Sequence, residues 1–381
     1  MKLTYITAGN LPSRWTHTIQ VVKMAQAFQQ IGQDVDLVTT CSLRDWNKDI
    51  SADIWEHYGI STSFKLTRFP LRRLIQKEIK RSLGRFSYGY FAALYAKYKS
   101  ADLVFARNYL APYWSSRIGI PTIAETHGDP DENYQKKRLY KATKMNSFRA
   151  LVTISEILAE KYTKAGVPEN KIIVEQDGVD FSMFSTIREQ DVLKLRKTLL
   201  NRRKAIALYA GHLYDYKGIP IILEVARILH DVSFILVGGW DTDIRRVESM
   251  IAESGLGNIR LIGFVPNNKV PVYLKASDIL LLPNSGKHHQ ASTTSPLKLF
   301  EYMAAGRPIV ASAISNIVSV LSHERNACLY DTDDMKGLVS SIKSLLINKK
   351  KASELAQQAQ TDAKKYDWRQ RCKRILDFAG F

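Results

Sequence analysis

The sequence predicts an α/β protein of two domains, each built on a doubly wound parallel sheet with helices on both faces. The chain has 381 residues, and a domain typically takes about 100–200. Short apolar segments alternate with amphipathic ones, which is the pattern of parallel sheets covered by helices. This alternation breaks once, near residues 177–184, and then starts again, so a second domain is expected.

The first half opens with a strand at residues 2–8, a turn-rich loop and a helix that Gly32 ends. One face of this helix carries apolar residues at three-residue spacing: Ile19, Val22, Ala25, Phe28 and Ile31. A strand at residues 34–39 follows, which completes the strand, helix, strand unit of a parallel sheet. Further strands are expected at residues 103–106, 122–125, 150–154 and 171–174.

A charged helix at residues 189–200 follows the break, and the pattern then restarts. Strands are expected at residues 205–210, 233–237, 259–262, 279–282 and 308–311. Helices are expected at residues 219–229, 242–254, 296–305 and 335–346. Ligands of open parallel sheets bind beyond the carboxyl ends of the strands, so the loops there are the candidate sites.

The helix expected at residues 296–305 has the features of an anion site. Ser295 is a suitable N-cap, Pro296 suits the first helical position, and Gly306 ends the helix. The free amides of the first turn, the helix dipole and Lys298 would attract a phosphate. Glu301 lies on the same helix face as Lys298 and could bind a sugar hydroxyl. The alternative is an exposed ion pair between these two side chains.

A second loop, at residues 209–218, follows the strand expected at the start of the second half. It contains Gly211, His212 and Lys217, of which the last two could reach a diphosphate at the same sheet edge. Alone this pattern is weak, because a single histidine is more often structural. No G-x-G-x-x-G follows the first strand and no P-loop motif occurs, so the dinucleotide and P-loop interpretations lose their main support.

Together these segments make the whole chain resemble the GT-B nucleotide-sugar glycosyltransferases, specifically the large family 4 of retaining enzymes. The matching parts occur in the family's order: Pro12-Ser13 with His17, Glu125-Thr-His127, Asp177-Gly-Val-Asp180 with Phe184, Gly211 with Lys217-Gly218, Gly238-Gly239, and residues 295–311. Several spaced motifs over nearly the full length are far more specific than any one of them. The resemblance implies two Rossmann-like domains that face a cleft.

The resemblance also implies which residues form the site. Lys217 would meet the donor diphosphate, Glu301 the ribose hydroxyls, and His127 would lie beside the donor sugar. The expected catalytic residues are therefore His127, Lys217, Lys298 and Glu301. The expected donor-binding residues are Gly211, His212, Lys217, Ser295, Leu297, Lys298 and Glu301. The alternative for His127 is a hydrogen-bonded histidine at a strand end.

The chain departs from the family at two donor positions. His212 stands where the family often has arginine, and Thr293 stands where it often has a glutamate that touches the donor sugar. We expect Lys298 to compensate at the phosphates. No metal and no cofactor is expected, because the nucleoside-diphosphate sugar is itself the donor substrate. Asp241-Thr-Asp243 looks like a metal motif, but acids at a helix start simply favour the dipole. His288-His289 is expected to be solvated.

By this resemblance, residues 1–185 form the acceptor-binding domain and residues 186–365 the domain that binds the nucleotide sugar. Residues 366–381 form a helix that crosses back to the first domain. The reaction implied is transfer of a sugar to an acceptor hydroxyl with retention of configuration. Fixed cations and helix amides would stabilise the leaving diphosphate more strongly in the transition state than in the ground state.

Positive charge is the outstanding feature of the composition: the net charge is +18, from 55 Lys and Arg against 37 Asp and Glu. Residues 65–85 hold eight basic side chains and one acid. On a helical wheel, one side of this segment is apolar: Leu71, Leu74, Ile75, Ile79, Leu83 and Phe86. A basic amphipathic helix over residues 65–86 suits an anionic membrane surface, which points to a glycan or lipid-linked acceptor. The alternative is an ordinary helix with a solvated basic face.

The remaining observations concern location and competing functions. Residues 1–8 lack the apolar core of a signal peptide, no stretch approaches the ~20 apolar residues that span a bilayer, and three scattered cysteines favour a reducing compartment. We expect a cytoplasmic protein that is peripheral at the inner membrane face. A nucleotide-sugar epimerase of the same fold would need cleft carboxylates that we do not identify. The other alternative is a nucleic-acid-binding or DNA-glucosylating protein that uses its positive charge on phosphate backbones. No nucleic acid partner is expected, however, because the basic segment lacks a reading motif.

Overall fold

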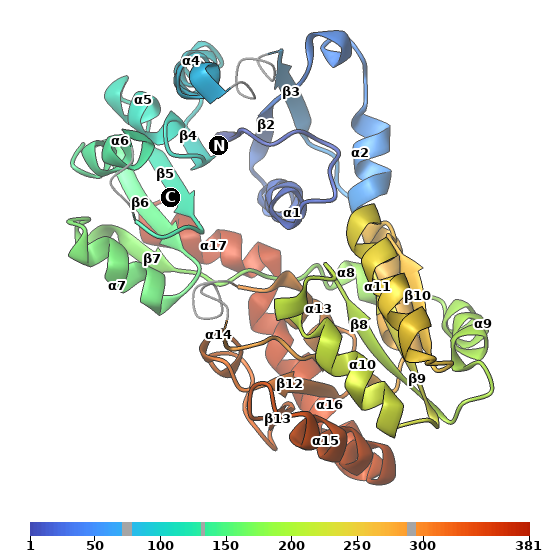
Figure 1. The fold of residues 1–381 in the computed structure, drawn as a ribbon. Coiled ribbons are helices and arrows are strands. Elements are labelled where there is room, and N and C mark those ends of the chain that lie inside the picture. Colours follow the sequence, from blue (N-terminus) through green and yellow to red (C-terminus); the bar gives the residue numbers. More distant parts are fainter. Residues whose placement is uncertain (71–77, 131–133, 288–294) are drawn as a thin grey trace. The chain divides into compact units, whose positions relative to one another are not determined.

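A computed structural model describes residues 1–70, 78–130, 134–287 and 295–381 of the chain, and it divides them into two compact units. Unit 1 is Met1–Asp177 together with Trp368–Phe381, and unit 2 is Gly178–Asp367. Each unit is built on one parallel sheet with helices packed against it (Figure 1). The predicted fold class is therefore confirmed.

The sheet of unit 1 has seven strands in the order β3-β2-β1-β4-β5-β6-β7. Every neighbouring pair is parallel. The strands are β1 (Lys2–Thr7), β2 (Asp34–Thr40), β3 (Lys65–Phe69), β4 (Leu103–Arg107), β5 (Thr122–Thr126), β6 (Phe148–Thr153) and β7 (Ile172–Val174). The central strands are almost wholly buried, which is why they appear in the sequence as continuous apolar runs.

The helices of unit 1 cover both faces of this sheet. They are α1 (Thr16–Gln30), α2 (Ser51–Tyr58), α4 (Glu78–Tyr98), α5 (Ala111–Arg117), α6 (Tyr134–Thr143), α7 (Glu156–Lys164) and α17 (Trp368–Ala379), with short 3₁₀ turns at Leu43–Asp45 and Glu169–Lys171. Adjacent residues of β1 point to opposite faces: Tyr5 packs on Phe28 of α1, and Ile6 packs with Tyr88 of α4. The last helix of the chain, α17, packs beside α1 and β6.

The sheet of unit 2 has six parallel strands in the order β10-β9-β8-β11-β12-β13. They are β8 (Ala205–Ala210), β9 (Val232–Val237), β10 (Ile259–Gly263), β11 (Ile279–Leu282), β12 (Ile309–Ser312) and β13 (Cys328–Tyr330). Its longer helices are α9 (Glu189–Leu200), α10 (Ile219–Ile228), α11 (Asp241–Ser254), α12 (Val270–Ala276), α13 (Leu297–Ala304), α15 (Met335–Ile347) and α16 (Lys349–Ala363). Shorter turns are α8 (Ser182–Ser185), α14 (Ser315–Val318), Asp215–Lys217, Asn267–Lys269 and Lys364–Tyr366.

Two hydrophobic clusters hold this second sheet between its helices. One joins β8 and β11 to α13 through Leu208, Leu280 and Phe300. The other joins the opposite face to α10 and α15 through Phe234, Ile222 and Leu338. All six of these side chains are fully buried.

Strand order reverses at one place in each sheet, and this places the candidate sites. In unit 1 the reversal lies between β1 and β4, and in unit 2 between β8 and β11. At such a switch point the loops from the two strands leave in opposite directions and open a crevice for a ligand. The loops that follow β1, β4, β8 and β11 are therefore the candidate ligand-binding loops.

The basic segment differs from its prediction. Lys65 and Arg68 lie in strand β3, at the edge of the sheet, and not in a helix. Lys65 forms an ion pair with Asp36 at 2.7 Å, while Arg68 donates to the carbonyl oxygen of Asp45 at 2.7 Å. Residues 71–77 lie outside the described residues, and the helix α4 begins at Glu78. The predicted helix over residues 65–86 is therefore wrong in its first part.

Among the described residues, no helix combines the length and the apolar character of a membrane span. The three cysteines, Cys41, Cys328 and Cys372, are buried free thiols.

Candidate functional site

Helix α13 is tied to the switch point of unit 2 by a buried hydrogen bond. The backbone N–H of Ala210, the last residue of β8, donates to the Tyr302 hydroxyl at 2.7 Å. The helix begins at Leu297 with Pro296 in the N-cap position, so the predictions of a Ser295 cap and of Pro296 as first helical residue are both wrong by one position. The start of α13, with its unsatisfied amides, nonetheless lies beside the end of β8.

Lys298 is the unusual residue of this helix. Its ammonium nitrogen lies 3.8 Å from the centroid of the Tyr209 ring and has no hydrogen-bond partner among the described residues. Burial lowers the pKa of Lys298 well below its usual value, and the nearby cation Lys217 adds to this effect. The alternative of an exposed ion pair with Glu301 is therefore wrong as regards exposure, because Lys298 is buried and its Nζ has no hydrogen-bond partner among the described residues.

The loop after β8 approaches the same nitrogen. A Cβ atom on Gly211 would lie 3.0 Å from Lys298 Nζ, and the backbone of Gly211 has a φ of +139°. Both facts explain a glycine at this position, since a side chain would displace the lysine and strain the backbone. Lys298 therefore points at the Gly211 turn.

Lys217 follows in the same loop and is half-buried. Burial lowers its pKa to about 8, and its Nζ lies 4.9 Å from the centroid of the Tyr216 ring. Gly218 turns the chain into α10 with a φ of +87°, where a Cβ atom would lie 2.0 Å from the carbonyl oxygen of Pro283. Because Pro283 directly follows β11, this contact brings the two switch-point loops together. We call Lys217 and Lys298 the lysine pair.

His212 is placed by aromatic stacking. Its ring stacks on Tyr214 at 5.3 Å and on Trp240 at 5.6 Å, with interplanar angles of 20° and 11°. Burial and the lysine pair lower the pKa of His212, so its neutral form is favoured near pH 7. The structure thus brings His212 to the predicted region, while its contact with a diphosphate stays a prediction.

The other predicted donor residues lie on or next to α13. Glu301 is half-buried and accepts a hydrogen bond from the Asn267 side chain at 3.4 Å. Leu297 has a buried side chain, so its contribution to a ligand would be its backbone amide. Ser295 precedes the helix by two residues. The roles of these three residues as ligand contacts stay predictions.

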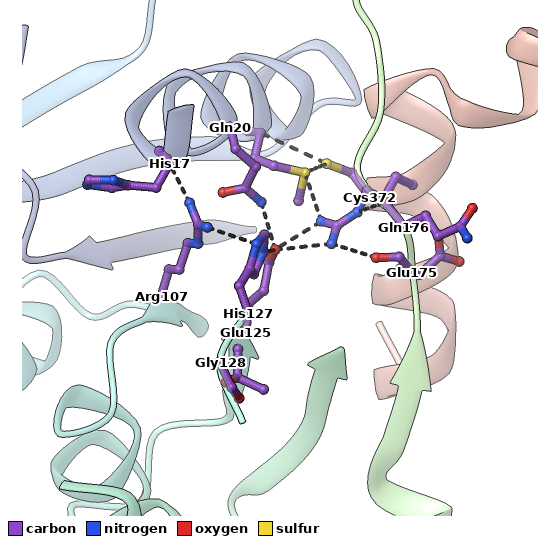
Figure 2. Close-up of polar contacts among 12 residues, drawn as sticks. His17, Gln20, Arg107, Glu125, His127, Gly128, Glu175, Gln176 and Cys372 are labelled. Carbon is purple, nitrogen blue, oxygen red and sulfur yellow. Dashed lines mark hydrogen bonds and ion pairs between the residues drawn. The ribbon is translucent and has the colours of Figure 1, made fainter. Parts of the chain in front are cut away.

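Next to the switch point of unit 1, on the strand that neighbours β4, lies Glu125, the fourth residue of β5. Its Oε1 atom accepts from three donors: Gln20 at 2.7 Å, His127 at 2.6 Å and Arg371 at 3.1 Å (Figure 2). Burial alone would raise the pKa of Glu125, but Arg371, with the hydrogen bond from His127, holds it well below its usual range. A fully buried carboxylate therefore stays ionised. We call Gln20, Arg107, Glu125, His127 and Arg371 the glutamate cluster.

His127 uses both ring nitrogens inside this cluster. Arg107, at the end of β4, lies with Nη2 2.9 Å from His127 Nδ1, and its Nη1 donates to the His17 carbonyl oxygen at 2.7 Å. A guanidinium has no acceptor atom, so Arg107 is the donor and His127 Nδ1 carries no proton. The proton of the neutral ring is on Nε2, which donates to Glu125.

Arg371 comes from the last helix and is 1% exposed. Its five N–H groups all have acceptors, since the guanidinium also donates to the carbonyl oxygens of Glu175 at 3.0 Å and Gln176 at 2.8 Å and approaches Met24 Sδ at 3.2 Å. The bond to Glu125 spans 246 residues of sequence.

Sequence analysis missed Arg107 and Arg371. Arg107 ends an apolar strand at a switch point, and that position was a usable signal. Arg371 interrupts the apolar stripe of α17: Trp368, Cys372, Ile375, Leu376 and Ala379. An arginine on the buried face of an amphipathic helix indicates a buried partner of opposite charge. That signal was in the sequence as well.

Two groups of described residues bring three metal-ligating atoms within 4.8 Å of one another: Glu125 with His127 and Asp177, and His323 with Glu324 and Cys328. A metal-bound histidine ordinarily donates from its other ring nitrogen. Here that nitrogen accepts instead, in His127 from Arg107 and in His323 from the Leu329 amide at 2.9 Å. Neither donor set fits a metal.

Two further motifs could in principle bind metals, and the structure describes only one of them. Asp241 and Asp243 lie in the first turn of α11, where acids favour the helix dipole. His288-His289 lies outside the described residues.

Solved structures with the same architecture identify the fold. HepE from Anabaena, crystallised in complex with UDP, superposes with a TM-score of 0.75 at 17% sequence identity over 99% of both chains. The fold is that of the GT-B glycosyltransferases. Two family models then match adjoining parts of the sequence: Glycosyltransferase Family 4 at residues 18–182 and Glycosyl transferases group 1 at residues 193–362. The chain belongs to the group 1 glycosyltransferases of GT-B fold.

Curated relatives match over shorter stretches. The amylovoran biosynthesis glycosyltransferase AmsK of Erwinia amylovora is 28% identical over 195 residues, which is 50% of this chain and 46% of the relative. A Campylobacter jejuni transferase, named as adding N-acetylgalactosamine to N,N'-diacetylbacillosaminyl-diphospho-undecaprenol, is 27% identical over 220 residues, or 57% of this chain and 56% of the relative. The chain spans about half the length of these relatives.

Proposed function

We propose that the protein transfers a sugar from a nucleoside-diphosphate sugar to an acceptor hydroxyl in glycan biosynthesis, with retention of configuration. The observation that carries the proposal is Lys298, a buried ammonium nitrogen with no hydrogen-bond partner among the described residues, beside the Gly211 turn. Burying a cation without a partner is costly, so the site is best explained by an anion that completes it. The UDP bound to HepE supports a nucleotide as that anion.

The lysine pair and the amides of α13 would hold the diphosphate, and Glu301 would hold the ribose hydroxyls. Negative charge grows on the diphosphate as the sugar leaves, so fixed cations stabilise the transition state more than the ground state. This assignment needs no metal. Unit 2 is thereby the donor unit and unit 1 the acceptor unit, and the place of His127 beside the donor sugar stays a prediction.

A nucleotide binding assay tests the donor site directly. UDP, GDP, CDP and ADP are titrated into the protein by calorimetry, and release of nucleotide from the matching sugar donors is then measured. We expect one nucleotide to bind and Lys298→Met to weaken it at least tenfold. Lys343→Met is the matched control, because Lys343 is an exposed lysine of α15. Equal affinity in both variants would contradict the proposal, and NMR of the product distinguishes retention from inversion.

We propose further that the acceptor is lipid-linked and that the protein meets it at the cytoplasmic face of the membrane. The name of the Campylobacter jejuni relative supports such an acceptor. The described part of α4 adds an exposed stripe of large hydrophobic side chains: Phe91, Leu94 and Tyr98 share one face and are 49%, 37% and 79% exposed. Lys97 and Lys99 flank Tyr98, which is the composition of an interfacial helix.

Vesicle co-sedimentation tests this surface. We expect the protein to bind vesicles that contain phosphatidylglycerol at low salt, and the double variant Phe91→Ser/Tyr98→Ser to lose most of that binding. Ile347→Ser is the control, since Ile347 is a highly exposed apolar residue of α15 in unit 2. Absence of binding by the unaltered protein would overturn the membrane proposal and leave the donor site untouched.

A further inference from the structure

Glu125 and Arg371 of the glutamate cluster are not expected to contact the sugar donor or the sugar acceptor, and the geometry of the cluster suggests another role for them. Glu125 and Arg371 are 3% and 1% exposed, so neither reaches solvent. Glu125 nevertheless forms its shortest hydrogen bond, at 2.6 Å, with His127, whose side chain is 19% exposed. The buried pair therefore acts on a residue at the surface of the switch point.

The direction of each hydrogen bond follows from the chemistry of the partners. An ionised carboxylate only accepts, so His127 Nε2 must donate to Glu125. Arg107 only donates, so His127 Nδ1 must accept. The two bonds are compatible with a single neutral form of the imidazole, the one with its proton on Nε2. The opposite tautomer would direct Nδ1–H at a guanidinium N–H and a bare Nε2 at a carboxylate.

We propose that Arg371, acting through Glu125, is a positioning residue that fixes His127 in the Nε2-protonated tautomer and thereby leaves Nδ1 as the acceptor that orients Arg107. Arg371 keeps Glu125 ionised, and the ionised carboxylate selects the tautomer. The inference rests on the proposed function only in treating His127 as part of the site.

The consequence for the site concerns Arg107. With both ring nitrogens engaged, His127 has no nitrogen free to take a proton from an acceptor hydroxyl. Arg107 makes two hydrogen bonds, to His127 and to the His17 carbonyl oxygen, and a guanidinium has five N–H groups. Its remaining donors make Arg107, at the carboxyl end of β4, the group of this cluster that is able to contact a substrate anion or hydroxyl. His127 holds it there.

Nitrogen-15 NMR of the histidine rings tests the proposal on the whole protein without any substrate. The His127 signals are assigned by their loss in His127→Gln. In the unaltered protein we expect Nε2 to appear as a protonated nitrogen and Nδ1 as an unprotonated, hydrogen-bonded one. In Arg371→Met the pattern should change, because an unneutralised Glu125 favours a second proton on the ring. In Glu125→Gln it should change to a mixture of tautomers, because an amide also donates.

Arg374→Met is the matched control: Arg374 lies on the same helix and pairs with Glu175 at 2.6 Å, away from Glu125. It should leave the His127 signals as they are. The proposal is overturned if the unaltered protein carries the proton on Nδ1, or if Glu125→Gln and Arg371→Met both retain the original pattern. Glu125→Gln keeps the size of the side chain, so it remains informative if Arg371→Met does not fold.

Kinetics distinguish this inference from the proposed function. If donor turnover is measurable, Glu125→Gln should lower kcat by about tenfold or more, as expected when a histidine loses its tautomer partner, with little change in the KM for the donor. If no donor is turned over, the proposed function fails while the NMR result still decides the tautomer.

Discussion

The switch points of the two units carry opposite kinds of polar cluster. In unit 1 the glutamate cluster is satisfied from within: Glu125 has three donors on one oxygen, and Arg371 uses all five of its N–H groups. In unit 2 the lysine pair is two buried or half-buried amines near each other, and Lys298 has no hydrogen-bond partner among the described residues. A satisfied cluster contributes to the stability of the fold, whereas an unsatisfied one costs stability, and the proposed diphosphate would reduce that cost.

The largest effect that follows from this difference is the loss of Arg371. Arg371→Met leaves a buried carboxylate without its cation, which should lower the free energy of unfolding by about 3–5 kcal/mol in urea denaturation. The control Arg374→Met removes a pair in which the arginine is 43% exposed and the carboxylate of Glu175 is 9% exposed, so water can partly replace the lost cation and the cost should be clearly smaller. Adding Glu125→Gln to Arg371→Met should recover part of the loss. A similar loss of stability in Arg371→Met and Arg374→Met would contradict the view that the glutamate cluster stabilises unit 1.

Gly218 tests how tightly the unit 2 switch point is packed. Gly218→Ala adds a methyl group 2.0 Å from the Pro283 oxygen in a backbone with φ of +87°, so the two loops must separate. Gly32→Ala has a similar φ of +89° with no atom within 4 Å, and it measures the backbone strain alone, about 1–2 kcal/mol. We expect Gly218→Ala to cost about 1–3 kcal/mol more and to weaken nucleotide binding. Equal losses of stability in Gly218→Ala and Gly32→Ala would show that the two loops can separate at no cost.

Lys298→Met should separate stability from binding. The variant removes a buried amine that has no hydrogen-bond partner among the described residues, so the free energy of unfolding should stay the same or rise. Nucleotide affinity should fall by about 10–100-fold, the worth of a hydrogen bond to a charged group of about 1.5–3 kcal/mol. A loss of stability like that of Arg371→Met would mean that Lys298 is structural and would remove the contrast between the units.

The smallest effect is a pH dependence from Lys217. Its pKa in the folded protein is about 8 against an ordinary value of 10.5, so the unfolded chain binds more protons between these values. The free energy of unfolding without ligand should therefore rise with pH over that window. Nucleotide affinity should fall above pH 8, because Lys217 loses the charge that binds phosphate. Calorimetry in buffers of different ionisation heat should show proton uptake on binding, and Lys217→Met should reduce it.

The strands and the site loops were accessible to sequence reasoning because their signals are local. Strands at residues 205–210 and 279–282 and the helix at residues 189–200 occur as predicted, since apolar runs and caps mark them. The proximity of Lys298 to the loop with Lys217 was also predicted, because a helix start and a strand end are visible in sequence, while their role at a donor stays a prediction. Their burial was not visible, since it depends on Tyr209 and on contacts across the sheet.

The errors arise where tertiary contacts outweigh local patterns. Residues 65–86 were treated as one basic amphipathic segment, but Lys65 and Arg68 at its start lie in β3, an edge strand, where such residues are tolerated. The glutamate cluster could not be predicted from the sequence, because its members come from four separate elements: α1, β4, β5 and α17. The His127 motif identified the position, while the donors that fix its ring lie far away in sequence.

The return of α17 to unit 1 has a consequence for how the protein is made. The ribosome completes residues 1–177 and must then add a further 194 residues (371 − 177) before it has added Arg371. At about 5–20 residues per second this interval lasts roughly 10–40 s. During it the nascent amino-terminal part holds a carboxylate without its counter-ion and an uncovered face of α1. That part reaches its mature form only after all of unit 2 has been translated. The tautomer of His127 is therefore fixed only at the end of synthesis.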